Sequence, residues 1–177
     1  RQPGVERFLI QPARQLEECH FVVAGPNFPD VERWPANVRH VSHLAPDRHR
    51  AFYNEQRFTL NITRAEMTAV GYSPSVRLFE AGACGAPIIS DHWEGLDTFF
   101  APGREILVVR STEEVKAILL DMPETERLAM GACARAAVLA NHTAAHRVLE
   151  LEGYLASVGA GIAVPMFKAP QEVNAAP

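Results

Sequence analysis

Short apolar runs rich in β-forming residues alternate along this chain with stretches of helical spacing. The runs lie at 21–24, 38–41, 58–62, 87–90 and 106–109. Helical spacing is found at 46–55, 75–84, 96–100 and 112–120. A strand can pair in parallel with the previous one only after a crossover, usually a helix, has returned the chain to the starting edge. The alternation therefore predicts an α/β domain with a mostly parallel sheet flanked by helices.

The chain turns all-helical after Pro123. Helices are expected at 124–141 and 143–157, where they would wrap the flank of the sheet. The final stretch is dominated by Gly, Ala, Pro and polar residues without sustained periodicity, which is typical of a flexible tail or linker. A chain of 177 residues is long enough for one well-packed core. We therefore interpret 1–158 as one domain and 159–177 as a tail.

Composition excludes several classes of function. Seventeen basic and 21 acidic side chains give a net charge of −4, which does not indicate a partner nucleic acid. Cys19, Cys84 and Cys133 are widely spaced and odd in number, so they suggest reduced thiols in a cytoplasmic protein rather than a disulfide framework. No apolar run approaches the roughly 18 residues of a transmembrane segment. His40 and His43 lie on opposite faces of their expected strand, and no third ligand accompanies the pair His142 and His146, so no metal site is expected.

The most informative segment is 71–90, GYSPSVRLFEAGACGAPIIS. Ser73 or Ser75 is suited to cap the start of a helix, with Pro74 at its first position. Gly85 stands where a helix commonly ends. The segment predicts a short helix, loaded with small residues that allow close packing, between two strands.

The amino end of that helix would present unpaired amides and the positive end of the helix dipole at the carboxyl edge of the sheet, a site for an anion such as a diphosphate. Glu80 lies about 7.5 Å along the axis from Ser75, at about 1.5 Å per residue, where a carboxylate can accept hydrogen bonds from a ribose. The alternative for Glu80 is an ion pair with Arg77 on an exposed face.

Polar residues just after two of the strands are further candidates. Arg64 follows the strand at 58–62 and is placed to reach a phosphate, or to form a surface ion pair with Glu66. Asp91 and Glu94 follow the strand at 87–90, where they form either a catalytic pair or a turn that only positions a ligand. The tryptophan between them either covers a ligand or packs into a cleft between domains.

Several strings follow one another in an order typical of a known family. They are SVRLFEAGACGAPIIS, then DHWEGLDTFF, GREILVV and STEEV, preceded by FVVAGPNFPD and NVRHVSHLAPDRHRAFYNEQRFTLNITRAE. Together they resemble the nucleotide-binding C-terminal half of GT-B glycosyltransferases, of the group 1 and CgeB-like type, over roughly 21–155. The resemblance implies a Rossmann-like α/β domain and a nucleotide-sugar donor.

The resemblance also assigns roles to individual residues. The helix glutamate, here Glu80, would hold the ribose hydroxyls, and amides around Ser75 and Val76 would hold the diphosphate. The segment after the second strand, here His43 and Leu44, would lie near the base. The full set of candidate nucleotide-sugar-binding residues is Glu80, Ser75, Val76, Arg77, Tyr72, Ser73, Arg64, His43, Leu44 and Asp91.

The chain departs from the family pattern in two places. Tyr72 stands where many retaining members carry a second glutamate that touches the donor sugar. Three parts of the family pattern would precede the helix that starts near Val5: the first strand, the phosphate loop and the acceptor-binding N-terminal domain. These parts are not in this chain, so the catalytic residues stay unknown. In a doubly wound sheet that strand lies between those at 21–24 and 58–62. We therefore predict pairing with another copy, as in a homodimer, or a sheet closed differently, rather than a regular six-stranded sheet.

The leading hypothesis is the donor-binding domain of a metal-independent glycosyltransferase. It would bind a nucleoside-diphosphate sugar and, together with the N-terminal domain, transfer the glycosyl group to an unknown acceptor; alone it would turn over little or nothing. No cofactor or metal is expected, because no DXD motif follows a strand. One alternative is a sugar-nucleotide epimerase with Asp91 and Glu94 as acid and base. The other is a non-catalytic nucleotide-binding or scaffold module, which Tyr72 mildly favours.

Overall fold

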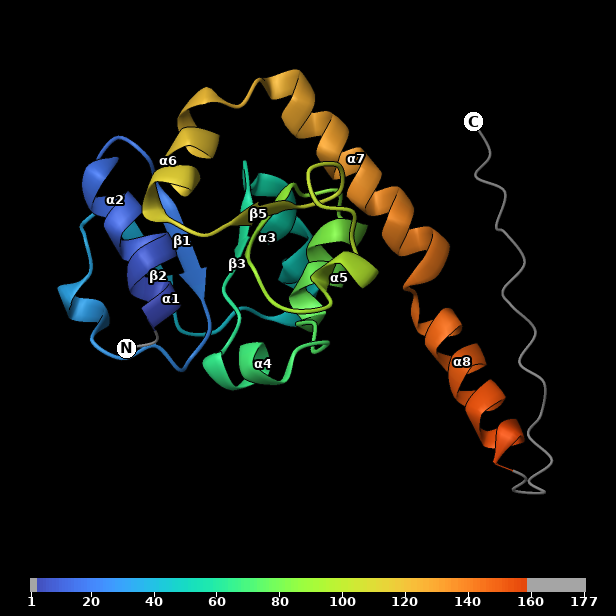
Figure 1. The fold of residues 1–177 in the computed structure, drawn as a ribbon. Coiled ribbons are helices and arrows are strands. Elements are labelled where there is room, and N and C mark those ends of the chain that lie inside the picture. Colours follow the sequence, from blue (N-terminus) through green and yellow to red (C-terminus); the bar gives the residue numbers. More distant parts are fainter. Residues whose placement is uncertain (1–2, 159–177) are drawn as a thin grey trace.

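The computed structural model describes residues 3–158, in which strands and helices alternate as far as β5 and only helices follow (Figure 1). The strands are β1 (Phe21–Ala24), β2 (Val38–Val41), β3 (Thr59–Asn61), β4 (Ile88–Asp91) and β5 (Leu107–Val109). The helices are α1 (Pro3–Val5), the π-helical turn η1 (Glu6–Ile10), α2 (Gln11–Gln15), α3 (His49–Glu55), α4 (Ala65–Val70), α5 (Val76–Ala83), α6 (Thr112–Asp121), α7 (Glu124–Asn141) and α8 (Ala144–Ser157). Short 3-10 turns are η2 (Val31–Arg33), η3 (Pro46–Arg48) and η4 (Leu96–Thr98). The predicted α/β alternation is confirmed.

One helix was not predicted from the sequence. α4 lies between Arg64 and Gly71, and it contains no buried residue. A helix without a buried face leaves no apolar periodicity in the sequence, so the pattern that identified the other helices was absent here. The predicted helix at 96–100 is only the 3-10 turn η4.

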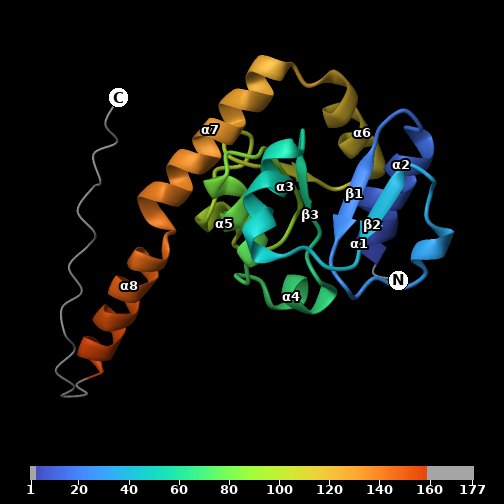
Figure 2. The ribbon, with the colours of Figure 1, turned by 180° about the vertical axis from the view of Figure 1, so that it is seen from behind.

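The strands form two parallel sheets rather than one. β1 pairs with β2, Phe21 lying opposite Val38, and the second sheet has the order β3-β4-β5. In that sheet Thr59 lies opposite Ile88. Within the described chain β1 and β3 each pair on one side only, and Figures 1 and 2 show β1 as the strand of its sheet nearer to β3. Residues 3–158 thus form no regular six-stranded sheet, as predicted, whereas pairing with a second copy stays a prediction.

The continuous helical segment from α1 to α2 joins the two sheets. Phe8 is buried against Ile89 and Val109 of the three-stranded sheet and against α6. At the other end of the segment, Asn37 beside β2 donates from Nδ2 to the carbonyls of Ala13, Leu16 and Cys19 at 3.0, 2.9 and 2.9 Å. One helical segment therefore holds both sheets in place.

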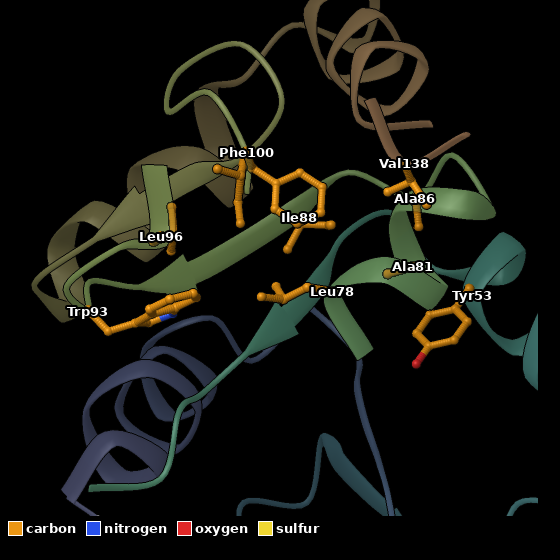
Figure 3. Close-up of a cluster of buried hydrophobic side chains, with 10 residues drawn as sticks. Tyr53, Leu78, Ala81, Ala86, Ile88, Trp93, Leu96, Phe100 and Val138 are labelled. Carbon is orange, nitrogen blue, oxygen red and sulfur yellow. The ribbon is translucent and has the colours of Figure 1, made fainter. Parts of the chain in front are cut away.

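The main hydrophobic core lies between the three-stranded sheet, α5 and the segment after β4 (Figure 3). Leu78 of α5 and Ile88 of β4 are almost completely buried, and Phe100 packs beside them. Trp93 belongs to this core with only 2% of its surface exposed. It therefore neither covers a ligand nor lines a cleft between domains, which were the two alternatives that its sequence position suggested.

Small residues allow α5 and α7 to pack closely. A Cβ on Gly82 would lie 2.8 Å from Val138 Cγ2, and a Cβ on Gly131 would lie 2.2 Å from the carbonyl oxygen of Gly85. Side chains at these positions would force the two helices apart. The small residues predicted to serve packing on the sheet thus also serve packing on α7.

α7 follows the flank of the domain, but α8 does not. Figures 1 and 2 both show α8 extending away from the sheets, and none of its residues is buried. The prediction that both C-terminal helices wrap the sheet is therefore wrong for α8, whose apolar Leu149, Leu151 and Tyr154 remain exposed. Across 3–158, no helix combines the length and hydropathy that crossing a membrane requires. The expected tail at 159–177 lies outside the described residues.

Candidate functional site

The amino end of α5 lies at the carboxyl edge of the three-stranded sheet. β3 and β4 are adjacent and parallel, so the crossover helix between them starts where the strands end. Ser75 has the extended conformation of an N-cap, with φ −71° and ψ 138°, and Gly85 beyond the helix has φ +72°. Ser75 rather than Ser73 is therefore the cap, and Ser73 lies in the half-buried turn before it. Open parallel sheets bind their ligands at this edge.

The first turn of α5 faces solvent. Ser75 Oγ accepts a hydrogen bond of 3.4 Å from the Arg77 amide. The Val76 side chain is 65% exposed, and Arg77 is exposed as well. The remaining first-turn amides and the positive end of the helix dipole favour an anion at this position.

Glu80, farther along α5, is held by a buried tyrosine of α3. Tyr53 Oη donates to Glu80 Oε2 at 3.0 Å, and Tyr53 is only 7% exposed. Burial and then the neighbouring Glu80 charge raise the pKa of the Tyr53 phenol, so it stays a donor at neutral pH. Among residues 3–158 no ion pair joins Glu80 to Arg77, which was the alternative for this carboxylate. The Glu80 carboxylate therefore has a defined orientation.

Tyr72 lies just before α5 in a left-handed backbone conformation, with φ +48°. Its amide donates to the Glu94 carbonyl at 2.7 Å, and its ring lies so close to Gly95 that a Cβ there would be 2.3 Å from Tyr72 Cδ1. The side chain is nevertheless 60% exposed. These contacts tie the turn before α5 to the segment after β4. Left-handed non-glycine residues cost conformational energy and gather at functional sites.

Asp91, at the end of β4, is buried and fully engaged. Its carboxylate accepts from the Thr63 amide at 3.0 Å to each oxygen and from Thr63 Oγ1 at 2.7 Å. Burial raises the pKa of the Asp91 carboxyl, and the hydrogen bonds from Thr63 lower it in part. Glu94, in contrast, is exposed. The two carboxylates that an epimerase would need are thus not presented together, because Asp91 faces Thr63.

The remaining candidates lie on exposed loops after strands. Arg64 is exposed and is the residue before α4, and no ion pair with Glu66 occurs within 3–158. His43 is exposed after β2, and the carbonyl of the adjacent Leu44 lies 3.3 Å from His49 Nε2. Tyr72, Ser75 and Glu80 lie along α5 and its preceding turn, whereas Arg64, His43 and Leu44 lie in loops after other strands.

A hollow of about 700 Å³ lies elsewhere, between α7 and the segment after η4. Phe99, Arg104, Cys133 and His142 are among the residues that line it. None of the sequence-predicted site residues does.

Sequence reasoning missed Tyr53 and Thr63. Thr63 carried one usable signal: it comes just after β3, as Asp91 comes at the end of β4, so both residues lie at the same edge of a parallel sheet. Tyr53 carried none, because its contact with Glu80 depends on how α3 packs against α5.

The fold is that of a GT-B glycosyltransferase domain: parallel strands flanked by helices. It superposes on sucrose-phosphate synthase from Thermosynechococcus elongatus with a TM-score of 0.68 and 16% identity over 91% of this chain and 43% of the other. Anabaena Alr3699/HepE in complex with UDP and glucose gives a TM-score of 0.65 and 12% identity, over 82% of this chain and 44% of HepE. The pneumococcal O-GlcNAc transferase GtfA in complex with UDP and GlcNAc superposes with a TM-score of 0.56 and 14% identity, over 85% of this chain and 31% of GtfA.

Residues 1–153 match the family described as glycosyl transferase-like, and the chain belongs to this family. No curated protein sequence matches it. The chain spans less than half the length of each of the three structures named.

Proposed function

We propose that this chain is the donor-binding domain of a glycosyltransferase and binds a nucleoside-diphosphate sugar at the amino end of α5. In this proposal the first-turn amides around Ser75 and Val76, assisted by Arg64 or Arg77, hold the diphosphate. The Glu80 carboxylate accepts hydrogen bonds from the ribose. The loop after β2, with His43 and Leu44, borders the base.

The observation that carries the proposal is the placement of Glu80 relative to the amino end of its own helix. Tyr53 occupies Oε2, and no group within 3–158 donates to Oε1, which is left as an acceptor for a ribose hydroxyl. A carboxylate whose rotamer is already held loses less entropy when it binds a ligand. In this proposal, the phosphates that such a ribose carries reach the exposed first turn of the same helix.

The chemistry that this arrangement supplies is stabilisation of a leaving group. When the sugar is transferred, the departing nucleoside diphosphate gains negative charge, and fixed amide donors stabilise that charge without reorganising. We therefore propose that departure requires no bound cation. The acceptor and its activating base would belong to an acceptor-binding N-terminal domain, which is the partner this proposal needs.

Two of the structural neighbours are complexes with UDP, so UDP is the first probe. Calorimetric titration of the purified chain with UDP, GDP and 2′,3′-dideoxy-UDP tests the proposal. We expect binding of at least one diphosphate, weaker binding of the dideoxy analogue if UDP binds, and no change of affinity on adding EDTA.

Glu80→Gln tests the role of the carboxylate, and Glu126→Gln on the exposed start of α7 is the matched control. The loss of a charged acceptor should cost about tenfold in affinity and abolish the preference for the ribose hydroxyls. A folded wild-type chain that binds no nucleotide contradicts the proposal and favours a non-catalytic module.

A further inference from the structure

The buried polar side chains of the described chain gather at one place. Apart from the aromatic Tyr53 and Trp93 of the core, the buried polar or charged side chains within 3–158 are Asn61, Thr63, Ser90 and Asp91. All four lie at or just beyond the carboxyl ends of β3 and β4. Burying a carboxylate is costly unless hydrogen bonds compensate, and a cluster at the ligand-binding edge of a sheet calls for an explanation beyond folding alone.

The hydrogen bonds in this cluster converge on one contact. Asn61 Nδ2 donates to Ser90 Oγ at 3.0 Å and to Thr63 Oγ1 at 3.3 Å. Thr63 in turn directs both its amide and its hydroxyl at the Asp91 carboxylate, with distances of 3.0 and 2.7 Å. Asp91 therefore fixes the backbone and the side chain of Thr63 together.

The residue after Thr63 is Arg64, which is exposed and extended, with φ −66° and ψ 144°. From there the chain forms α4 and returns to Tyr72, whose amide is held by the Glu94 carbonyl. The segment between Thr63 and Tyr72 is thus anchored at one end to Asp91, the last residue of β4, and at the other end to Glu94, just beyond that strand. The first anchor fixes the residue directly before Arg64, and the second fixes the turn that precedes α5.

We propose that Asp91 is a positioning residue, which acts through Thr63 to hold Arg64 where it contacts the diphosphate of the donor. This inference rests on the proposed function. It assigns Asp91 no contact with the ligand, in contrast to the direct role expected from the sequence, and it makes Arg64 rather than Arg77 the phosphate-binding arginine.

A double-mutant cycle on the purified chain tests the proposal, with UDP and uridine as probes. Asp91→Asn puts an amide where Thr63 donates, Arg64→Gln removes the guanidinium, and the third variant combines them. We expect each single variant to weaken UDP binding about tenfold, the size of one hydrogen bond to a charged group, and to leave uridine unaffected. The double variant should be no weaker than Arg64→Gln alone, because both changes remove the same contact.

Two variants separate positioning from folding. Thr63→Ser keeps both donors and should bind UDP as the wild type does. Thr63→Val removes the hydroxyl and should weaken the binding of UDP but not of uridine. If Asp91→Asn does not fold, Thr63→Val takes its place in the cycle. Asp97→Asn, at an exposed carboxylate of η4, is the control.

Three outcomes overturn the inference. Additive losses in the cycle mean that Asp91 does not act through Arg64, and equal losses for UDP and uridine mean that its role is only structural. Undiminished UDP binding by Asp91→Asn overturns the positioning role and leaves the proposed function intact. A folded wild-type chain that binds no nucleotide overturns both.

Discussion

Gly131 of α7 lies directly against the carbonyl oxygen of Gly85, which follows α5, so that a Cβ on Gly131 would be 2.2 Å from that oxygen. The contact joins the backbones of two glycines, so no side chain can change its rotamer to make room for a new Cβ. The carboxyl end of α5 and α7 can therefore pack at this distance only because position 131 is a glycine.

Gly131→Ala should therefore destabilise the domain by about 1–3 kcal/mol, because overpacking outweighs the helix propensity that alanine gains. Urea unfolding measures the change in the free energy of unfolding. Gly153→Ala in α8 is the matched control, since nothing lies within 4 Å of a Cβ there. It should be neutral or stabilising by up to about 1 kcal/mol. A Gly131→Ala variant as stable as the wild type would show that α5 and α7 separate easily.

Tyr53→Phe removes the hydroxyl that holds Glu80 and leaves the ring in the core. We expect nucleotide affinity to fall by a factor of about 3–10, as for one lost hydrogen bond, because the freed carboxylate must be ordered on binding. Calorimetry measures the affinity and urea unfolding the stability. Tyr154→Phe, at a side chain that is 68% exposed on α8, should change neither. Equal affinity in Tyr53→Phe and the wild type would argue against orientation of Glu80 by Tyr53.

Gly95→Ala should disturb the turn before α5. The φ of +88° strains an alanine, and the new Cβ would meet the Tyr72 ring at 2.3 Å. Gly103→Ala shares the strain, at φ +78°, but nothing lies within 4 Å of its Cβ. Backbone strain costs about 1–2 kcal/mol at either position, so the extra loss in Gly95→Ala measures displacement of Tyr72. Thermal unfolding of the two variants gives the comparison, and equal losses would mean that the ring moves freely.

His142, at the junction of α7 and α8, should make stability depend on pH. Its Nε2 lies 3.0 Å from the Phe99 carbonyl, and its ring lies 5.3 Å from that of Phe79. Burial lowers the pKa of His142. Facing charges on α8 also act on this pKa: Arg147 and His146 lower it, and Glu150 raises it.

The sign of the effect follows from that lowered pKa. The unfolded chain binds a proton at this histidine more readily than the folded chain, so the stability from neutral His142 is complete above about pH 6.5 and is lost as the pH falls through the folded pKa. Urea unfolding between pH 8 and 5 should show a smaller decline in His142→Gln than in the wild type. Parallel curves for the two proteins would contradict this prediction.

Much of the fold was predictable because its signals are local. The β-rich runs, a serine cap at Ser73 or Ser75 and the stop at Gly85 all lie within a few residues of the features they determine. The site was predictable only in outline. Glu80 and Asp91 were both candidates. Tyr53 holds one carboxylate oxygen of Glu80 and leaves the other free, whereas Asp91 is buried against Thr63. Nothing in the local sequence of either residue distinguishes these two outcomes.

By itself, the sequence determined the order of strands and helices, the parallel pairing and the position of a capped helix start at the sheet edge, because periodicity and capping depend on neighbouring residues. Tertiary structure alone decided that Tyr53 meets Glu80, that Thr63 meets Asp91, and that α8 leaves the domain. Such contacts join segments far apart in the chain, and their geometry follows from how whole elements pack.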